Sequence, residues 1–373
     1  MNALMQRIEN RRDDLITLTQ DLIRIPTLNP PGRHYHDICS LVGERMSKQG
    51  WKVEMVRAEG ALGDSDRYPR WNVVCRLEGR AAGDCVHFNS HHPEFRGAIE
   101  ISATADEESG GYGGVAYLAE RGFFDPARVQ HVIIPEPLNK DRICLGHRGV
   151  WWAEIETKGH IAHGSMPFLG DCAVRHMGAV LDEMEATLFP LLAGKRTDMP
   201  VVPDGAKSST LNINSIHGGE PVQDADYTGL PSACVPDRCI LTIDRRFLIE
   251  EDIAEGKAEV ARMMDKIRTT RPDFRYEIRD LFEVMPTMTP EDAPIVRTVQ
   301  DAVQKVMGKP AEFVVSPGTY DQKHIDRIGR LKNCIAYGPG VLDLAHQPDE
   351  WIGVDDMVDS GKVMALTLTK LLT

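Results

Sequence analysis

Four short segments of this sequence gather histidine and carboxylate side chains, the groups that proteins use to hold divalent metal ions. The segments are NSHH at 89–92, TADEESGG at 104–111, PEP at 135–137 and AHQPDE at 345–350. Together they supply a donor set suited to a hard or borderline divalent cation. We therefore predict a metal site assembled from parts of the chain that lie far apart in the sequence.

Each segment also has a simpler interpretation when it is taken alone. A pair such as His91 and His92 is more often an ordinary loop feature than a metal site. The acidic run from Asp106 to Glu108 is equally typical of a capped helix start. Glu136 stands between two prolines after an apolar run, where burial without a partner would be costly. The combination of all four segments favours the metal site over these separate interpretations.

The pattern of apolar residues predicts the elements that position these side chains. Short β-rich runs are expected at 51–56, 73–77, 85–88, 99–103 and 132–134, with a helix over 114–121. This order is typical of an α/β fold with a mostly parallel mixed sheet flanked by helices. In such sheets chemistry takes place at the carboxyl ends of the strands, and each polar segment follows one of these runs.

The rest of the chain predicts an insertion into this α/β layer. A helix over 5–25 opens the chain, and helices over 173–192 and 253–269 alternate with strands such as 240–247 in its middle. The α/β pattern of the first part then returns, with a helix over 294–307, a strand over 333–337 and a helix over 357–372. We therefore predict a discontinuous domain, 1–150 and 282–373, and an inserted α+β domain, 151–281.

Composition argues against several other classes of protein. A net charge of −13 disfavours a nucleic-acid partner, which needs clustered Lys and Arg. The apolar runs fall short of a membrane span, and the charged start of the chain does not have the pattern of a secretory signal. Eight cysteines without a CxxC pair suit reduced thiols and predict a cytoplasmic location. The sequence contains no GxSxG elbow, which disfavours a serine hydrolase.

In this order, the four segments, with GHIAHGSMP at 159–167 and VPDRCILTIDRR at 235–246, resemble the M20 family of metallopeptidases and deacylases. That family includes acetylornithine deacetylase, succinyl-diaminopimelate desuccinylase, aminoacylase and glutamate carboxypeptidase, and the likeness runs along nearly the whole chain. It implies a catalytic metal-binding domain with an inserted lid that forms a homodimer. It also implies two divalent metal ions, zinc first with cobalt or manganese as alternatives, and a small acidic N-acyl substrate.

The resemblance implies a role for each residue of the metal site. His91 and Glu136 would hold one metal ion, and Glu108 and His346 would hold the other. Glu107 would be the general base, which takes a proton from the attacking water and passes it to the departing amine.

Three further residues are expected to contact the substrate by the same resemblance. His163 in the lid would stabilise the carbonyl oxygen across the dimer interface. Arg246 would hold the substrate carboxylate by two hydrogen bonds, with a surface salt bridge as its simpler interpretation. Thr319 would be a second substrate-binding residue. Substrate identity stays open, because 232–234 reads Ser-Ala-Cys where relatives usually carry an Asn.

The sequence departs from the family pattern between its first two motifs. Pro93 stands where the family has an Asp, and Glu107 follows His91 by only 16 residues instead of several dozen. The family residues in that interval include the aspartate that bridges both metals. Nearby substitutes are His92, Glu94 and Asp106. We interpret the join between His92 and Pro93 as the point at which a family segment is absent from this chain.

The function expected from these features is metal-dependent hydrolysis of the amide bond in an N-acyl amino acid or a related acidic amide. Two alternatives stay open. One is a dipeptidase or carboxypeptidase of the same family, which differs in the leaving group. The other is a metal-poor binding relative that lost its chemistry with the missing segment.

Overall fold

The computed structural model describes residues 2–87, 95–219, 233–345 and 347–373. The chain divides into two compact units. Unit 1 comprises Met1–Gly146, Thr287–Val315 and Tyr320–Thr373, and unit 2 comprises His147–Pro286 and Ser316–Thr319. The first unit is therefore discontinuous in sequence, and the stretch predicted as an inserted domain, 151–281, falls inside unit 2.

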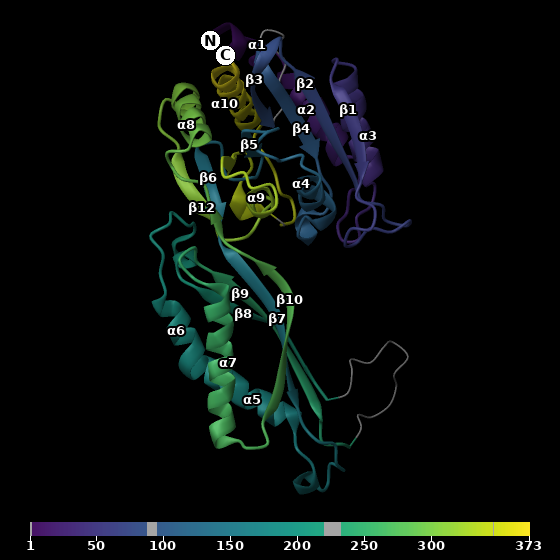
Figure 1. Cartoon of the computed structure of the whole chain (residues 1–373), viewed down its shortest axis with the longest axis vertical. Helices are drawn as coiled ribbons and strands as arrows, with labels where there is room; N and C mark the ends of the chain where they lie inside the picture. The colour runs from purple at the N-terminus through teal and green to yellow at the C-terminus, as the bar shows by residue number, and fades with distance from the viewer. Residues whose placement is uncertain (1, 88–94, 220–232, 346) are drawn as a thin grey trace. The chain divides into compact units, whose positions relative to one another are not determined.

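Unit 1 is built on a mixed sheet in which nine strands are described (Figure 1). The strand order is β1-β2-β4-β3-β5-β13-β6-β11, and β12 pairs with β6. The strands are β1 (Lys52–Arg57), β2 (Trp71–Glu78), β3 (Ala81–His87), β4 (Arg96–Ala103), β5 (His131–Ile134), β6 (Arg142–His147), β11 (Thr287–Met288), β12 (Glu312–Ser316) and β13 (Cys334–Ala336). The four central strands, β4, β3, β5 and β13, run parallel. The pairs β1–β2, β2–β4 and β13–β6 are antiparallel. The predicted α/β fold class is confirmed.

Helices cover both faces of this sheet. They are α1 (Asn2–Glu9), α2 (Arg12–Ile23), α3 (Tyr35–Ser47), α4 (Tyr117–Glu120), α8 (Pro294–Met307), α9 (Gln322–Arg327) and α10 (Val354–Leu372). Successive strand residues point to opposite faces, so Val73 packs with α3 and α10 while Val74 packs with α4 and α9. Burial on both faces explains the continuous apolar runs that mark these strands in the sequence.

Two predicted helices differ in the structure. The helix expected over 5–25 is two helices, because the N–H of Arg11 bonds to the carbonyl of Ile8 in a tighter turn between α1 and α2. The helix expected over 173–192 consists of α5 (Ala173–Glu183), a π-helical turn Met184–Leu188 and α6 (Phe189–Gly194). The turn widens next to Pro190, which has no N–H to donate. Apolar spacing does not reveal either break.

Unit 2 contains a four-stranded antiparallel sheet covered by helices on one face. Its order is β10 (Arg275–Val284), β7 (Gly149–Lys158), β9 (Arg238–Phe247) and β8 (Thr210–Gly218). Alternate residues of β9 are buried, and they pack with α5 and α7 (Ile253–Thr270) in a single apolar core. The period of two along β9 is the pattern expected for a sheet with one covered face.

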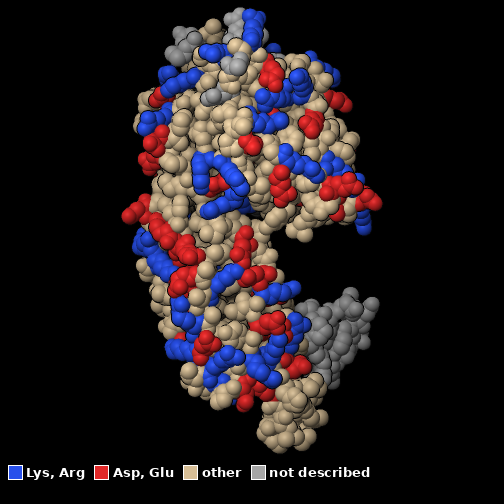
Figure 2. Space-filling view, viewed as in Figure 1, with Lys and Arg blue, Asp and Glu red and all other residues tan. Residues whose placement is uncertain are grey.

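Within the described residues, no helix is long and apolar enough to cross a membrane. All eight cysteines are described, and all are free thiols. Cationic and anionic side chains are interspersed over the described surface visible in Figure 2.

Candidate active site

The four predicted polar segments follow the four parallel strands at the centre of unit 1. Residues 88–92 follow β3, 104–111 follow β4, 135–137 follow β5, and the stretch that leads to 345–350 follows β13. Because these strands are neighbours and run the same way, their carboxyl ends share one edge of the sheet. His91, His92, Glu94 and His346 lie outside the described residues, whereas Glu107, Glu108 and Glu136 lie within them.

The loop after β4 presents Glu107 and Glu108 on a short 3-10 turn, Glu107–Ser109. Its geometry is set by the carbonyl of Asp106, which accepts hydrogen bonds from the N–H groups of Ser109 at 3.0 Å and Gly111 at 2.7 Å. Gly110 and Gly111 have φ values of 98° and 76°, which side chains other than glycine rarely adopt. The Asp106 carboxylate makes no capping bond, so the interpretation of this acidic run as a helix cap is wrong.

Asp106 is tied to other side chains and is not placed as a substitute metal ligand. Its Oδ2 accepts from Nε of Arg70 at 2.7 Å, and its Oδ1 accepts from the hydroxyl of Tyr35 at 3.3 Å. The side chains of Arg70 and Asp106 are 6% and 3% exposed. A carboxylate held in this way neutralises a buried guanidinium.

Glu107 and Glu136 both lie close enough to other acidic groups for those charges to raise their pKa values. Burial raises the pKa of Glu107 to about 8, and the charges of Asp321 and Glu136 add to the rise. Burial likewise raises the pKa of Glu136 to about 7, with Asp321 and Glu108 adding to it. Lys323 opposes the rise at both positions. The structure thus brings together three predicted carboxylates, Glu107, Glu108 and Glu136.

Asp321 and Lys323 belong to the same cluster and were not predicted from the sequence. Their side chains are 6% and 4% exposed, and Nζ of Lys323 is 3.9 Å from Oδ1 of Asp321. That oxygen is buried without a hydrogen-bond partner among the described groups. Burial raises the pKa of Asp321 to about 6, against the opposing effect of Lys323. In the sequence, TYDQK at 319–323, these two opposite charges stand two and four residues after the predicted substrate residue Thr319, and nothing else marks them.

The donor chemistry of this cluster fits a divalent cation. Among residues 2–87, 95–219, 233–345 and 347–373, no group of three or more His, Cys, Asp or Glu is placed to hold a metal ion. The predicted ligands His91 and His346 lie outside those ranges. The described carboxylates nevertheless crowd one another, and Asp321 Oδ1 has no hydrogen-bond partner. A bound cation offsets this kind of repulsion, so Glu108 and Glu136 remain suitable ligands.

The predicted substrate residues lie in unit 2. His163 is exposed, and its Nδ1 accepts hydrogen bonds from the hydroxyl of Ser165 at 2.8 Å and from the N–H of that serine at 3.2 Å. Arg246 on β9 donates two bonds, of 2.7 and 2.8 Å, to the carboxylate of Asp244 on the same strand. Thr319 is half-buried at the end of the segment Ser316–Thr319.

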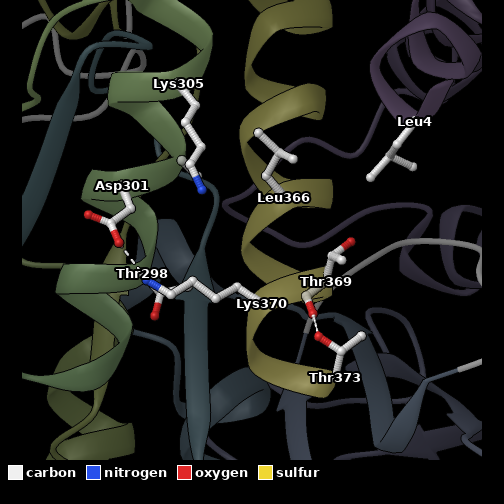
Figure 3. A pocket seen from close by; sticks show the side chains of 9 residues that line it. Leu4, Thr298, Asp301, Lys305, Leu366, Thr369, Lys370 and Thr373 are labelled. Atoms are coloured by element: carbon white, nitrogen blue, oxygen red, sulfur yellow. Dashed lines mark hydrogen bonds and ion pairs between the residues drawn. The ribbon is translucent and has the colours of Figure 1, made fainter. Parts of the chain in front are cut away.

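Two hollows among the described residues of unit 1 contain none of the predicted site residues. One, of about 240 Å³, lies between α1, α8 and α10, where Lys370 pairs with Asp301 (Figure 3). Another, of about 510 Å³, lies beside Tyr35 and Tyr68. The carboxylate cluster is therefore the candidate active site.

Comparison with known proteins identifies the family to which this fold and this cluster belong. A model of peptidase family M20/M25/M40 matches residues 82–370, so the chain belongs to that family. It is 27% identical to an acetylornithine deacetylase from Myxococcus xanthus, with 84% of this chain and 83% of the relative covered. It is 23% identical to a succinyl-diaminopimelate desuccinylase from Acinetobacter baylyi, with 97% and 99% covered.

A solved structure shares the fold at low sequence identity. Human carnosine dipeptidase 1 is 14% identical and has a TM-score of 0.71, with 99% of this chain and 98% of that chain covered. The family resemblance found in the sequence motifs is confirmed. The match to the Acinetobacter baylyi relative extends over 406 positions, more than the 373 residues of this chain. That relative therefore carries residues without a counterpart here.

Proposed function

We propose that this chain is a metal-dependent amidohydrolase that cleaves the amide bond of a small acidic N-acyl amino acid. The observation that supports this most directly is the environment of Glu107, at the carboxyl edge of the parallel strands and beside Glu136. A general base works best when its pKa lies near the working pH, and burial among carboxylates raises the pKa of Glu107 to about 8. Membership of a hydrolase family agrees with this role.

The reaction follows from the positions of the carboxylates. Two divalent ions, one held by Glu136 with the predicted ligand His91 and the other by Glu108 with the predicted ligand His346, would polarise the amide carbonyl and lower the pKa of a water. Glu107 takes a proton from that water as its oxygen bonds to the carbonyl carbon. When the C–N bond breaks, Glu107 gives the proton to the departing nitrogen, which leaves a carboxylic acid and a free amine.

The choice of an acidic substrate rests on Arg246. Its guanidinium already makes a two-bond contact with a carboxylate, that of Asp244, so its geometry suits the carboxylate of an amino acid. A substrate carboxylate would exchange with Asp244 at this position. The names of the relatives, a deacetylase and a desuccinylase, favour an acetyl or succinyl group on the other side of the bond.

We also propose that the chain forms a homodimer through unit 2. The segment that follows β7 exposes apolar side chains around His163, with Phe168 79% and Leu169 61% exposed. Ile161, Met166 and Val174 extend this exposed surface. Clusters of this kind mark protein contacts, and β8 is an edge strand beside them. Sedimentation should give a dimer for the natural chain and a monomer for Phe168→Asp; a monomeric natural chain would refute the proposal.

The activity is tested with protein that has been stripped of metal and reloaded with zinc, cobalt or manganese. Metal content per chain is measured beside hydrolysis of N-acetyl, N-succinyl and N-formyl amino acids and of dipeptides. Metal-dependent cleavage of an N-acyl amino acid supports the proposal. A preference for dipeptides indicates the dipeptidase alternative. A chain that retains no metal and cleaves none of these substrates is the binding relative.

A further inference from the structure

The backbone that carries Glu107 is held by a buried ion pair outside the carboxylate cluster. Arg70 precedes β2 directly, and its guanidinium lies against Asp106, the residue before Glu107. Besides the 2.7 Å bond to Asp106, Nη1 of Arg70 donates to the carbonyls of Pro31 and Tyr68, at 2.8 Å each. The guanidinium is thus fixed by acceptors from three segments of the chain.

The space around this pair is shaped to admit it and nothing larger. A Cβ on Gly32 would stand 2.4 Å from Nη1 of Arg70, and a Cβ on Gly63 would stand 2.7 Å from Nη2. A Cβ on Gly113 would stand 2.6 Å from Oδ2 of Asp106. Glycines from three separate segments therefore leave room for this ion pair. A chance contact at the surface would not need such space.

The pair fixes an unusual backbone conformation. Asp106 has φ of 62°, in the left-handed region that residues other than glycine seldom occupy. Its carbonyl closes the turn that presents Glu107, by accepting from Ser109 and Gly111. Strain of this kind persists only where the surroundings enforce it. The side-chain bonds of Asp106 to Arg70 and Tyr35 supply that enforcement.

Asn72, near the start of β2, bonds to the loop after β4 on both sides of the turn that carries Glu107. Asn72 accepts from the N–H of Ala105 at 2.9 Å and donates to the carbonyl of Gly113 at 2.9 Å. Arg70 thus holds Asp106, and Asn72 holds Ala105 on one side of the turn and Gly113 on the other. The residues at the start of β2 therefore hold the turn that carries Glu107 in place.

We propose that Arg70 is a positioning residue for the general base, acting through Asp106. This inference rests on the proposed function, because it assigns Glu107 the role of base. The hydrogen bonds of the Arg70 guanidinium go to Asp106, Pro31 and Tyr68, not to Glu107. Its side chain is buried, so it does not contact the substrate. Its loss therefore lowers kcat and leaves KM nearly unchanged, and a displacement of about 1 Å in the base costs about 100-fold in rate.

The test compares Arg70→Ala with Arg76→Ala in the metal-loaded enzyme. Arg76 is the matched control, because it lies on β2 in the same unit and pairs with the buried carboxylate of Glu100 at 3.2 Å instead of with Asp106. Arg70→Ala should lower kcat about 100-fold, and guanidinium chloride at millimolar concentration should restore part of the loss by filling the vacated space. Sodium chloride at equal ionic strength should restore nothing. Arg70→Lys, the milder variant, should fall between the two.

Hydrogen exchange separates this inference from the proposed function. Peptides that cover 104–116 should exchange faster in Arg70→Ala than in the natural chain, and guanidinium should slow them again, whether or not any substrate is cleaved. The same peptides should be unchanged in Arg76→Ala. Unchanged exchange at 104–116, or a rise in KM with kcat preserved, would overturn the positioning role. An inactive natural chain with guanidinium-reversible exchange would overturn only the proposed function.

Discussion

Gly111 lies directly against Asp321, because a Cβ on this glycine would stand 2.4 Å from Oδ1 of the aspartate. Gly111 also has φ of 76°, so Gly111→Ala meets both backbone strain and a collision with a buried carboxylate. We expect the free energy of unfolding to fall by about 2–4 kcal/mol, the sum of strain and overpacking. Urea unfolding measures the loss.

Gly122 provides the control for this substitution. Its φ is 81°, and a Cβ there would have no neighbour within 4 Å. Gly122→Ala should therefore lose only the strain, about 1 kcal/mol. Equal losses in the two variants would mean that the Asp321 contact does not constrain the loop after β4.

Glu107→Gln tests the general base without changing the size of the side chain. A positioned base contributes about 100- to 10,000-fold to the rate, so kcat should fall by that factor in metal-loaded protein. Glu120→Gln at the exposed end of α4, in the same unit, should keep full activity. Metal content should be the same in the natural chain and both variants, because Glu107 is not assigned as a ligand. Full turnover by the Glu107→Gln variant would refute the role of Glu107.

The fold of unit 1 could be predicted from the sequence because its central strands are buried on both faces and read as apolar runs. The same runs located Glu107 and Glu136, since each follows a strand that ends at the shared edge of the sheet. The strand order could not be predicted, because it depends on pairing between distant segments. The two breaks in the long helices were missed for a related reason. They arise from backbone hydrogen bonding that apolar spacing does not record.

The charged residues of the site were harder to predict than its strands. Asp321 and Lys323 are buried, yet in sequence they look like any charged pair at the start of a surface helix. Arg70 is a single arginine before a strand, and only its contact with Asp106 across 36 residues shows its role. Burial of a charge depends on which distant group neutralises it, and one sequence does not supply that information.

The stability of unit 1 should depend on pH through His324. This ring is 7% exposed and bonds through Nε2 to the carbonyl of Gly110 at 2.7 Å. Burial lowers the pKa of His324 from 6.5 to about 4. The unfolded chain therefore takes up a proton first as the pH falls below 6.5, and the folded state loses stability. Between pH 7 and pH 5 the contribution of His324 alone should be a loss of about 2 kcal/mol.

His324→Gln isolates this contribution, because Gln cannot be protonated in this range. Glu107 and Glu136, whose pKa values are raised, change stability in the opposite direction, but they do so in both proteins. Urea unfolding of the natural chain and the variant at pH 7 and pH 5 gives the difference. Equal changes in the two proteins between pH 7 and pH 5 would show that His324 accepts a proton without penalty in the folded state.

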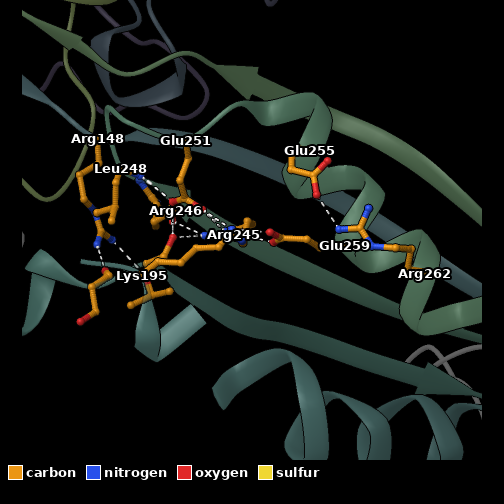
Figure 4. A network of polar contacts seen from close by, with 12 residues as sticks. Arg148, Lys195, Arg245, Arg246, Leu248, Glu251, Glu255, Glu259 and Arg262 are labelled. Atoms are coloured by element: carbon orange, nitrogen blue, oxygen red, sulfur yellow. Dashed lines mark hydrogen bonds and ion pairs between the residues drawn. The ribbon is translucent and has the colours of Figure 1, made fainter. Parts of the chain in front are cut away.

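The last prediction concerns a buried network of ion pairs in unit 2 (Figure 4). Glu251 accepts from Arg245 at 2.7 Å, from Lys195 at 3.0 Å and from the N–H of Leu248 at 2.9 Å. Burial raises the pKa of Glu251, but Arg245 and the hydrogen bonds outweigh it and leave the pKa lowered. Glu251→Gln should cost about 3–5 kcal/mol at pH 7, because Arg245 loses its principal buried counter-charge.

The neighbouring Glu250→Gln is the control for this network. Glu250 is exposed and accepts one bond, at 2.7 Å from the hydroxyl of Thr197, so its change should cost about 1 kcal/mol or less. The lowered pKa of Glu251 stabilises the natural chain above its unfolded value near 4.5, and this stability is lost as the pH falls through the folded value. The gap between the natural chain and Glu251→Gln should therefore narrow on acidification. A gap that stays constant from pH 7 to pH 3 would show that packing around Glu251, not its charge, holds unit 2 together.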